Sequence, residues 1–245
     1  MSFSVVIPAR FASKRLPGKV LLDIGGKPML QHVYERACSS NASSVSIATD
    51  DERVREAAEA FGAKVCMTSL AHRSGTDRIH EVAGQLGLPE DAVLVNVQGD
   101  EPLIPPSAIN QVAANLVSNA SAGISSLCEV IINQEEIANP NAVKVVLDDR
   151  GFALYFSRTT IPFGSSASAK NCLRHIGIYA YRVAVLNQFV AWPPSELEVQ
   201  EKLEQLRALF NGIRIHMEIS QECVPAGVDT EKDLETVRAH LAGSI

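Results

Sequence analysis

Short apolar runs alternate with amphipathic stretches through the first hundred residues. The runs predict four strands, at residues 3–7, 45–49, 63–67 and 92–97. Because they are almost continuously apolar, they are typical of strands covered on both faces, as in parallel sheets. Helices are predicted between them, one after Pro28 and one over residues 51–61 with Asp50 as its cap, and another opens at Pro105. This alternation predicts βαβ units.

The middle of the chain changes to strand-like runs with few helices between them. These runs are residues 124–132, 143–147, 153–156 and 176–181. Small polar residues at 163–170 predict a mobile loop or lid. A helical stripe at 197–210, a strand at 213–219 and a last helix from Glu231 follow. We therefore predict the α/β class, with one domain over residues 1–245. Its mixed, mostly parallel sheet has helices on both faces and a smaller antiparallel sub-sheet.

Composition and charge narrow the class of protein. The chain has 245 residues, of which 46% are hydrophobic and 5% aromatic, and its net charge is −6. We expect no nucleic-acid partner, because proteins that bind nucleic acids present a basic surface and this chain is acidic overall. The five cysteines lack C-x-x-C spacing, which argues against zinc sites and disulfides. The sequence has no signal pattern and no apolar run long enough to span a bilayer, so we expect a cytoplasmic protein with no membrane partner.

A basic loop follows the first predicted strand. Residues 8–19 contain four cations, two prolines and a glycine. The cations can neutralise a polyphosphate, the glycine allows close backbone approach, and the prolines restrict the loop. Neither G-x-x-x-x-G-K-[ST] nor G-x-G-x-x-G occurs in the chain. The loop therefore predicts phosphate binding by side-chain charge, with a solvated basic loop as the alternative.

Two carboxylates follow predicted strands, at the end of the sheet where ligands bind. Asp100 stands between Gly99 and Glu101 with Pro102 close behind, which makes a rigid, exposed acid. Magnesium prefers such an oxygen ligand and completes its shell with substrate phosphates, so we interpret Asp100 as a metal ligand rather than a turn cap. Asp229 repeats the pattern after the last strand, but from its residues alone the N-cap interpretation is favoured.

The loop at residues 72–78 combines two arginines, two hydroxyls and a glycine ahead of a helix. Hydroxyl and backbone groups can bind the edge of a base, and a helix start favours anions. Ser74 or Thr76 can also cap the helix, and both roles are compatible.

Two other residues, Arg158 and His175, are candidates for binding a sugar or acid substrate. Arg158 and His175 stand at the ends of central strands and could supply a cation and a hydrogen-bond donor. A structural role is the default for a lone histidine such as His175. Glu204 and Gln205 lie on a predicted amphipathic helix, where a solvated polar face is the default.

Together these segments resemble the 3-deoxy-manno-octulosonate cytidylyltransferases, also called CMP-KDO synthetases. The matching segments lie in family order along nearly the whole chain, at residues 7–10, 15–19, 72, 74–78, 96–102, 155–158, 174–179, 203–207 and 227–230. The first loop is shared with many sugar nucleotidyltransferases. The Gln-Gly-Asp-Glu-Pro, His-Ile-Gly and Leu-Glu-Gln-Leu-Arg segments are far more specific.

The resemblance implies a Rossmann-like nucleotidyltransferase fold, usually a homodimer. Its members make CMP-KDO and pyrophosphate from CTP and KDO with Mg²⁺, for lipopolysaccharide biosynthesis. The implied nucleotide site comprises Pro8, Ala9, Arg10, Ser13, Lys19, Arg73, Ser74 and Arg78. The implied sugar-acid site comprises Gln98, Arg158, His175, Glu204 and Gln205. Asp100 and Asp229 are implied magnesium ligands, which replaces the cap interpretation of Asp229, and Arg10 and Lys19 join them as catalytic residues.

Two positions depart from the family pattern. Lys14 stands where a small hydroxyl residue is common, and Phe210-Asn211 replaces a frequent aromatic pair. The implied reaction is attack of the anomeric hydroxyl of the sugar on the α-phosphate of CTP, which needs positioning and charge stabilisation. No side chain stands out as a general base. The alternatives are CMP transfer to sialic acid or to an amino variant of KDO, and a non-catalytic nucleotide sensor, which would be expected to lose a metal carboxylate.

Overall fold

Four parallel strands form one half of the main sheet in the computed structural model, which describes residues 2–13, 15–72, 74–164 and 172–243. Their order is β5-β4-β1-β6. They are β1 (Phe3–Pro8), β4 (Ser44–Thr49), β5 (Lys64–Met67) and β6 (Val93–Asn96). The apolar runs predict all four, and both β1 and β6 are buried along their whole length, as the prediction requires.

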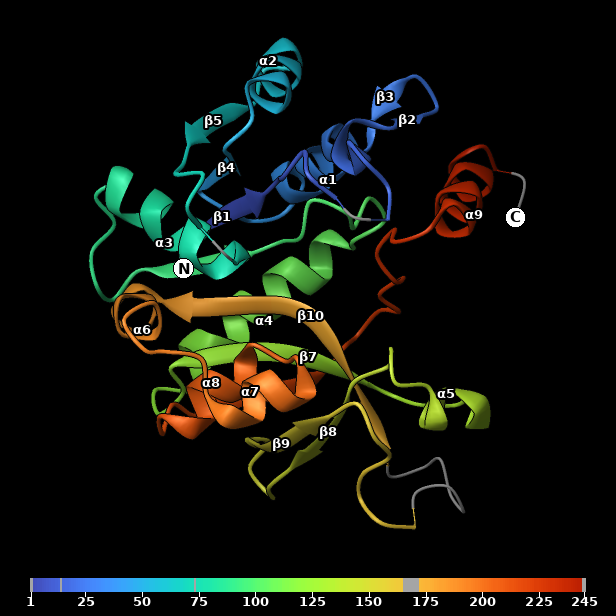
Figure 1. The fold of residues 1–245 in the computed structure, drawn as a ribbon. Coiled ribbons are helices and arrows are strands. Elements are labelled where there is room, and N and C mark those ends of the chain that lie inside the picture. The colour runs from blue at the N-terminus through green and yellow to red at the C-terminus, as the bar shows by residue number, and fades with distance from the viewer. Residues whose placement is uncertain (1, 14, 73, 165–171, 244–245) are drawn as a thin grey trace.

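The other half of the sheet is mixed. The central β10 (Leu173–Arg182) pairs antiparallel with β6 and with β7 (Ile124–Val130), and β11 (Ile215–Ile219) runs parallel to β7. The strands β8 (Lys144–Leu147) and β9 (Ala153–Ser157) add an antiparallel pair beside β10 (Figure 1). A separate two-stranded sheet joins β2 (Asp23–Ile24) to β3 (Lys27–Pro28). The predicted mixed sheet with antiparallel additions is confirmed.

Helices cover both faces of this sheet (Figure 1). The described helices are η1 (Lys19–Leu21), α1 (Met29–Cys38), α2 (Glu52–Ala60), α3 (Gly75–Gln85), α4 (Pro106–Ser118), α5 (Gln134–Ala138), α6 (Val183–Phe189), α7 (Glu196–Glu201), α8 (Gln205–Phe210) and α9 (Glu231–Leu241). Buried residues of α1, α2 and α4 share one core with Val5 and Ile7 of β1. Those of α3, α6 and α8 share a second core with Val6 of the same strand. Successive residues of β1 thus enter different cores, which explains its unbroken apolar run.

Two predicted helices are corrected by the structure. The N-cap of α2 is Asp51, not Asp50, because the Asp51 side chain accepts from the Arg53 amide while Asp50 pairs with an arginine elsewhere. The predicted single helix at 197–210 is two short helices, α7 and α8. Lys202 breaks them with a left-handed φ of 56°. Most of the predicted loop at 163–170, from residue 165 on, lies outside the described part of the chain.

The C-terminal helix α9 packs beside the β2–β3 pair, on the same side of the molecule as the basic loop (Figure 1). Its Leu234 and Val237 enter a small apolar cluster with Ile24, Met29 and Val228, and Leu16 of the basic loop packs against that cluster. Helix α9 begins at Thr230, which forms a capping box with Asp233. The fold therefore fixes the segment just ahead of α9 next to the basic loop.

Candidate active site

The candidate active site is a cleft at the carboxyl ends of β1 and β6. A cavity of about 210 Å³ there is lined by Pro8, Arg10, Ala12, Ser13, Lys19, Val20, Gly75, Gln98, Gly99 and Asp100. Gly99 is needed for the close approach of the two strand ends, since a Cβ on it would lie 2.9 Å from the Pro8 carbonyl oxygen. The predicted nucleotide residue Ala9 is fully buried behind this wall, and its amide donates to the Ala48 carbonyl at 2.8 Å.

Lys19 links the two carboxylates that the sequence singles out. Its ammonium donates to Asp100 Oδ2 at 2.5 Å and to Asp229 Oδ1 at 3.1 Å. Arg15 forms a second ion pair with Asp229, at 2.9 Å between Nη2 and Oδ2. The N-cap interpretation of Asp229 is therefore wrong: Thr230 caps α9, and the Asp229 carboxylate faces cations.

The ion pairs keep Lys19 charged although it is mostly buried. Burial is the largest influence and lowers the pKa of Lys19, but the charges and hydrogen bonds of Asp100 and Asp229 together outweigh it and leave the pKa raised. A backbone hydrogen bond of 2.8 Å from the Val228 amide to the Asp100 carbonyl holds the two acidic segments together. At Gly227 a Cβ would stand only 3.3 Å from that same oxygen, so a small residue suits the contact.

The chemistry of this donor set suits a hard divalent cation. Among the described residues no group of three or more histidine, cysteine or carboxylate side chains could enclose a metal by itself. Two carboxylates that already share one cation provide the one or two protein ligands that Mg²⁺ takes when substrate phosphates supply others. The residues present therefore fit magnesium held jointly with a phosphate ligand.

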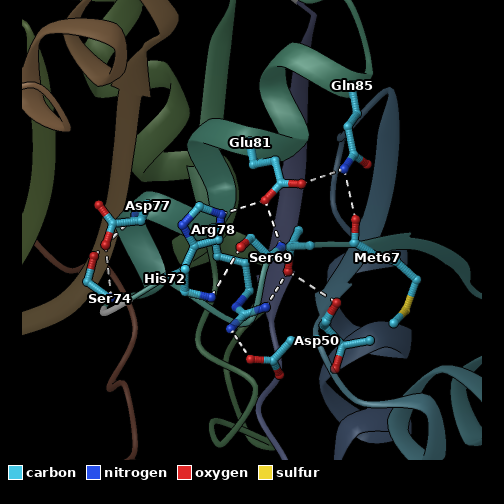
Figure 2. Close-up of polar contacts among 12 residues, drawn as sticks. Asp50, Met67, Ser69, His72, Ser74, Asp77, Arg78, Glu81 and Gln85 are labelled. Carbon is cyan, nitrogen blue, oxygen red and sulfur yellow. Dashed lines mark hydrogen bonds and ion pairs between the residues drawn. The ribbon is translucent and has the colours of Figure 1, made fainter.

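Figure 2 shows how the loop ahead of α3 is held. His72 bonds to Glu81, and the same carboxylate accepts from the Ser69 amide at 2.9 Å. Ser74 caps α3 in a capping box with Asp77, so the predicted cap is confirmed at Ser74. Arg73 lies outside the described residues. These contacts fix the loop against α3 with the start of the helix directed at the cleft, where Gly75 forms part of the wall.

Arg78 is fully buried and contacts protein groups rather than the open cleft. Its guanidinium pairs with Asp50 at 2.7 Å and donates to Thr68 (Figure 2). Arg10, which lines the cleft, has its pKa lowered by burial first and by the charge of Arg78 second. Arg78 therefore adds positive potential behind Arg10, which favours an anion in the cleft.

Glu204 and Gln205 lie at the start of α8, across from α3. Glu204 Oε2 accepts from Thr76 Oγ1 at 2.6 Å, and burial raises the pKa of this carboxyl. Gln205 Nε2 is buried and has no hydrogen-bond partner among the described residues. Both residues line a small cavity of about 70 Å³ that also contacts Tyr179 and Tyr181 of β10. An unsatisfied amide donor there favours a polar ligand.

Neither His175 nor Arg158 is among the residues that line the cleft. His175 packs against Phe156 and Tyr179 and has Nε2 3.1 Å from Ser126 Oγ. Burial lowers its pKa to about 3, with a smaller contribution from Arg174, so it is neutral. The Arg158 guanidinium donates to the backbone carbonyls of Glu201, at 2.8 Å, and of Pro140, at 3.0 Å. In this structure Arg158 holds the end of α7.

A sequence profile described as Cytidylyltransferase matches residues 4–215 of the chain, which include most of the cleft. The chain belongs to the cytidylyltransferase family. Curated relatives named 3-deoxy-manno-octulosonate cytidylyltransferase include one from Vibrio campbellii, 57% identical, with 99% of this chain and 98% of the relative covered. One from Saccharophagus degradans is also 57% identical, and one from Haemophilus influenzae is 53% identical, both over the full length of each chain.

Solved structures agree with this membership. A CMP:2-keto-3-deoxy-manno-octonic acid synthetase complexed with CTP matches with a TM-score of 0.92 and 44% identity, covering 100% of this chain and 99% of the other. A cytidylyltransferase from Leptospira borgpetersenii matches with a TM-score of 0.65 and 16% identity, covering 100% of this chain and 87% of the other, which supports the fold alone. The Rossmann-like nucleotidyltransferase fold is confirmed.

Sequence reasoning missed one acidic neighbour in this cytidylyltransferase site. Glu101 follows Asp100, and its Oε2 is sealed from solvent without a hydrogen-bond partner among the described residues. Burial, and then the charge of Asp100, raise its pKa to about 8. Glycines at 177 and 227 face it, with would-be Cβ atoms 4.0 and 3.4 Å from its side chain. Two adjacent acids at one strand end were the available signal, because both cannot stay ionised cheaply when one is buried.

Proposed function

We propose that this chain transfers a cytidylyl group from CTP to 3-deoxy-manno-octulosonate (KDO), giving CMP-KDO and pyrophosphate. The observation that carries the proposal is the Lys19 ammonium between Asp100 and Asp229, at the mouth of a cleft that Arg10 also lines. Such a group of charges suits a polyphosphate with a divalent cation better than a neutral ligand. The full-length relatives named for this activity support the choice of both substrates.

The basic loop would hold the triphosphate. Arg10, Ser13 and Lys19 line one wall of the cleft, and the raised pKa of Lys19 keeps its ammonium charged throughout the neutral range. Gly75, which Ser74 precedes as the cap of α3, forms the other side of the cleft next to Pro8, where the cytosine would lie. Positive side chains next to the leaving pyrophosphate would stabilise its developing negative charge and so lower the barrier to its departure.

Asp100 and Asp229 would hold Mg²⁺ together with oxygens of the nucleotide. When bound, the ion would supply charge neutralisation at the phosphates and lower the pKa of a coordinated hydroxyl. Without a ligand, Lys19 and Arg15 neutralise these carboxylates. When the nucleotide binds, the carboxylates would turn to Mg²⁺ and the two cations would be available to the phosphates.

The sugar acid would lie between the cleft and the start of α8. Gln98 lines the cleft, and Gln205 offers a buried amide donor without a partner among the described residues. Glu204, positioned by Thr76, would accept a hydrogen bond from a sugar hydroxyl. His175 and Arg158 complete the set of residues predicted for the sugar-acid site. With a pKa of about 3, His175 is a weak base, and we assign it a neutral hydrogen-bonding role.

We also propose a cytoplasmic homodimer of one-domain subunits. All five cysteines are free, which suits a reducing compartment. The described residues contain no helix long and apolar enough to cross a bilayer. Several large apolar side chains are exposed, among them Ile132, Leu154, Val199 and Phe210. Such side chains suit a subunit contact.

The activity is tested by pyrophosphate release from CTP with a panel of octulosonic and nonulosonic acids, and product masses identify the transferred group. We expect the highest kcat/KM with KDO, and lower values with amino-KDO and sialic acid. A preference for sialic acid would replace the proposed acceptor. Release that does not depend on any sugar acid, or no release at all, would contradict the proposal.

A further inference from the structure

The two ends of the basic loop meet at Phe11 and Gly18. The Gly18 amide donates to the Phe11 carbonyl at 3.0 Å, which closes the loop. The Phe11 ring also packs on Gly18, because a Cβ there would lie 3.1 Å from two ring carbons. Gly18 has a φ of 68°, a conformation that other residues rarely adopt. The base of the loop therefore depends on close packing between this ring and this glycine.

Arg53, in the first turn of α2, stacks on the same ring. Its guanidinium carbon lies 3.4 Å from the ring centroid of Phe11. Asp51 fixes the plane of the guanidinium, since its two oxygens accept from Arg53 Nε at 2.9 Å and from Nη2 at 2.6 Å. A continuous stack thus runs from helix α2 to the base of the basic loop.

The stack ends next to the cleft. Gly18 is the N-cap of η1, whose first residue is Lys19, the cation that bridges Asp100 and Asp229. The side chain of Arg53 is 60% exposed and does not line the cleft. Any effect of Arg53 on a ligand there must therefore pass through the loop.

We propose that Arg53 is a positioning residue for the nucleotide. By stacking on Phe11 it holds the two ends of the basic loop in the arrangement that receives the triphosphate. This inference rests on the proposed function, because CTP is the ligand whose binding it improves. Asp51 is a partner in the same device, since it orients the guanidinium over the ring.

Kinetics with a matched control test this role. Arg55 is also an arginine on α2, but it pairs with Glu52 and Glu59 of its own helix. We expect Arg53→Ala to raise the KM for CTP about three- to fivefold, the loss expected for one exposed cation–π contact. The KM for the sugar acid should change less than twofold, and Arg55→Ala should alter neither. Combining Arg53→Ala with Phe11→Leu should give less than the product of the two separate effects.

Hydrogen exchange of the nucleotide-free protein separates this inference from the proposed function. The Gly18 amide should exchange several-fold faster in Arg53→Ala than in the wild-type protein or Arg55→Ala, while the unfolding temperature stays close to wild type. If the Gly18 amide exchanges equally fast in Arg53→Ala and Arg55→Ala, Arg53 does not hold the base of the loop and the proposal is overturned, whatever the activity. If Gly18 exchange rises but the KM for CTP does not, the loop is held by Arg53 without serving the nucleotide, which also overturns the proposal. If the wild-type protein does not use CTP, the proposed function fails, and with it the role of Arg53 in positioning CTP; the exchange result then decides only whether Arg53 clamps the loop.

Discussion

The central residues of the site depend on one another for charge balance. Lys19 is mostly buried and stays protonated because Asp100 and Asp229 lie within hydrogen-bond reach of its ammonium. If one carboxylate were removed, the other would have to neutralise the buried ammonium alone. If both were removed, burial would lower the pKa of Lys19. Two carboxylates that already bind one cation can also bind the divalent cation that accompanies a nucleotide.

Replacing Asp100 by asparagine should abolish most turnover without unfolding the protein. The change removes one charge at a partly exposed position, so we expect unfolding within a few degrees of wild type and at least about a 100-fold loss of kcat, as for loss of a charge that acts on the transition state. Steady-state pyrophosphate release with saturating Mg²⁺ measures it. Asp149→Asn, at an exposed turn, is the control. Near-normal turnover in Asp100→Asn would remove this residue from the metal site.

Glu101 should make stability fall as the pH rises. Its pKa is about 8 in the folded protein against 4.5 as the ordinary value, so between these pH values the folded state holds a proton that the unfolded state has lost. The free energy of unfolding should therefore fall by up to about 1.4 kcal/mol per pH unit in this window. Urea unfolding of the wild-type protein and Glu101→Gln, without nucleotide, at pH 5, 6.5 and 8 tests this. A wild-type minus variant difference that does not change with pH would show that Glu101 is ionised in the folded state.

At the scale of elements, the C-terminal segment ahead of α9 brings Asp229 close to Asp100. The Val228 amide bonds to the Asp100 carbonyl at 2.8 Å, and buried Val228 joins the cluster that docks α9. Asp229 follows directly and reaches Lys19, which is 210 positions away in the sequence. The position of α9 therefore sets the separation of the two carboxylates.

Weakening the docking of α9 should raise the Mg²⁺ requirement. Leu234 is 1% exposed in that cluster, so Leu234→Ala should cost about 2–4 kcal/mol of stability. Because Asp229 then moves more freely, we expect a several-fold higher Mg²⁺ concentration for half-maximal rate. The matched control is Leu241→Ala at the exposed end of the same helix. An unchanged Mg²⁺ requirement in a destabilised Leu234→Ala variant would separate α9 from the metal site.

Local patterns predicted the elements better than the contacts between them. Apolar runs identified β1 and β6 because both faces of these strands are buried. The break at Lys202 was not visible, since a left-handed lysine leaves no local signal, and the Glu198–Arg207 ion pair that folds α8 onto α7 depends on that break. Asp51 and not Asp50 caps α2 because Asp50 pairs with Arg78, a contact set by the fold.

The same limit applies to the candidate site. Arg10 and Asp100 follow strands β1 and β6, where parallel-sheet topology predicts ligands, and Lys19 ends the basic loop that leaves β1; all three line one cleft. That Lys19 bridges Asp100 and Asp229 could not be inferred, since these pairs are 81 and 210 positions apart in the sequence. The role of Arg53 was missed for the same reason, because an arginine in an acidic helix start gives no sign of the ring it covers.

At the scale of the whole molecule, we expect two copies of the chain to associate. Among the described strands, β9 pairs with β8 alone, and exposed Leu154 lies on β9. Light scattering after gel filtration should give twice the 26.4 kDa chain mass at micromolar concentration. Leu154→Asp should lower that mass if this strand lies in the contact. A wild-type mass of one chain, independent of concentration, would contradict the dimer.

The central claim is transfer of a cytidylyl group, and direct competition between nucleotides tests it best. Equal concentrations of CTP and UTP are mixed with KDO, Mg²⁺ and enzyme, and the products are followed by phosphorus NMR and mass. A site that offers an acceptor to the cytosine amino group leaves uracil unpaired, so we expect CMP-KDO and pyrophosphate in equal amounts, with CTP preferred by at least about tenfold. Equal use of the two nucleotides, or no KDO-dependent pyrophosphate, would contradict the account.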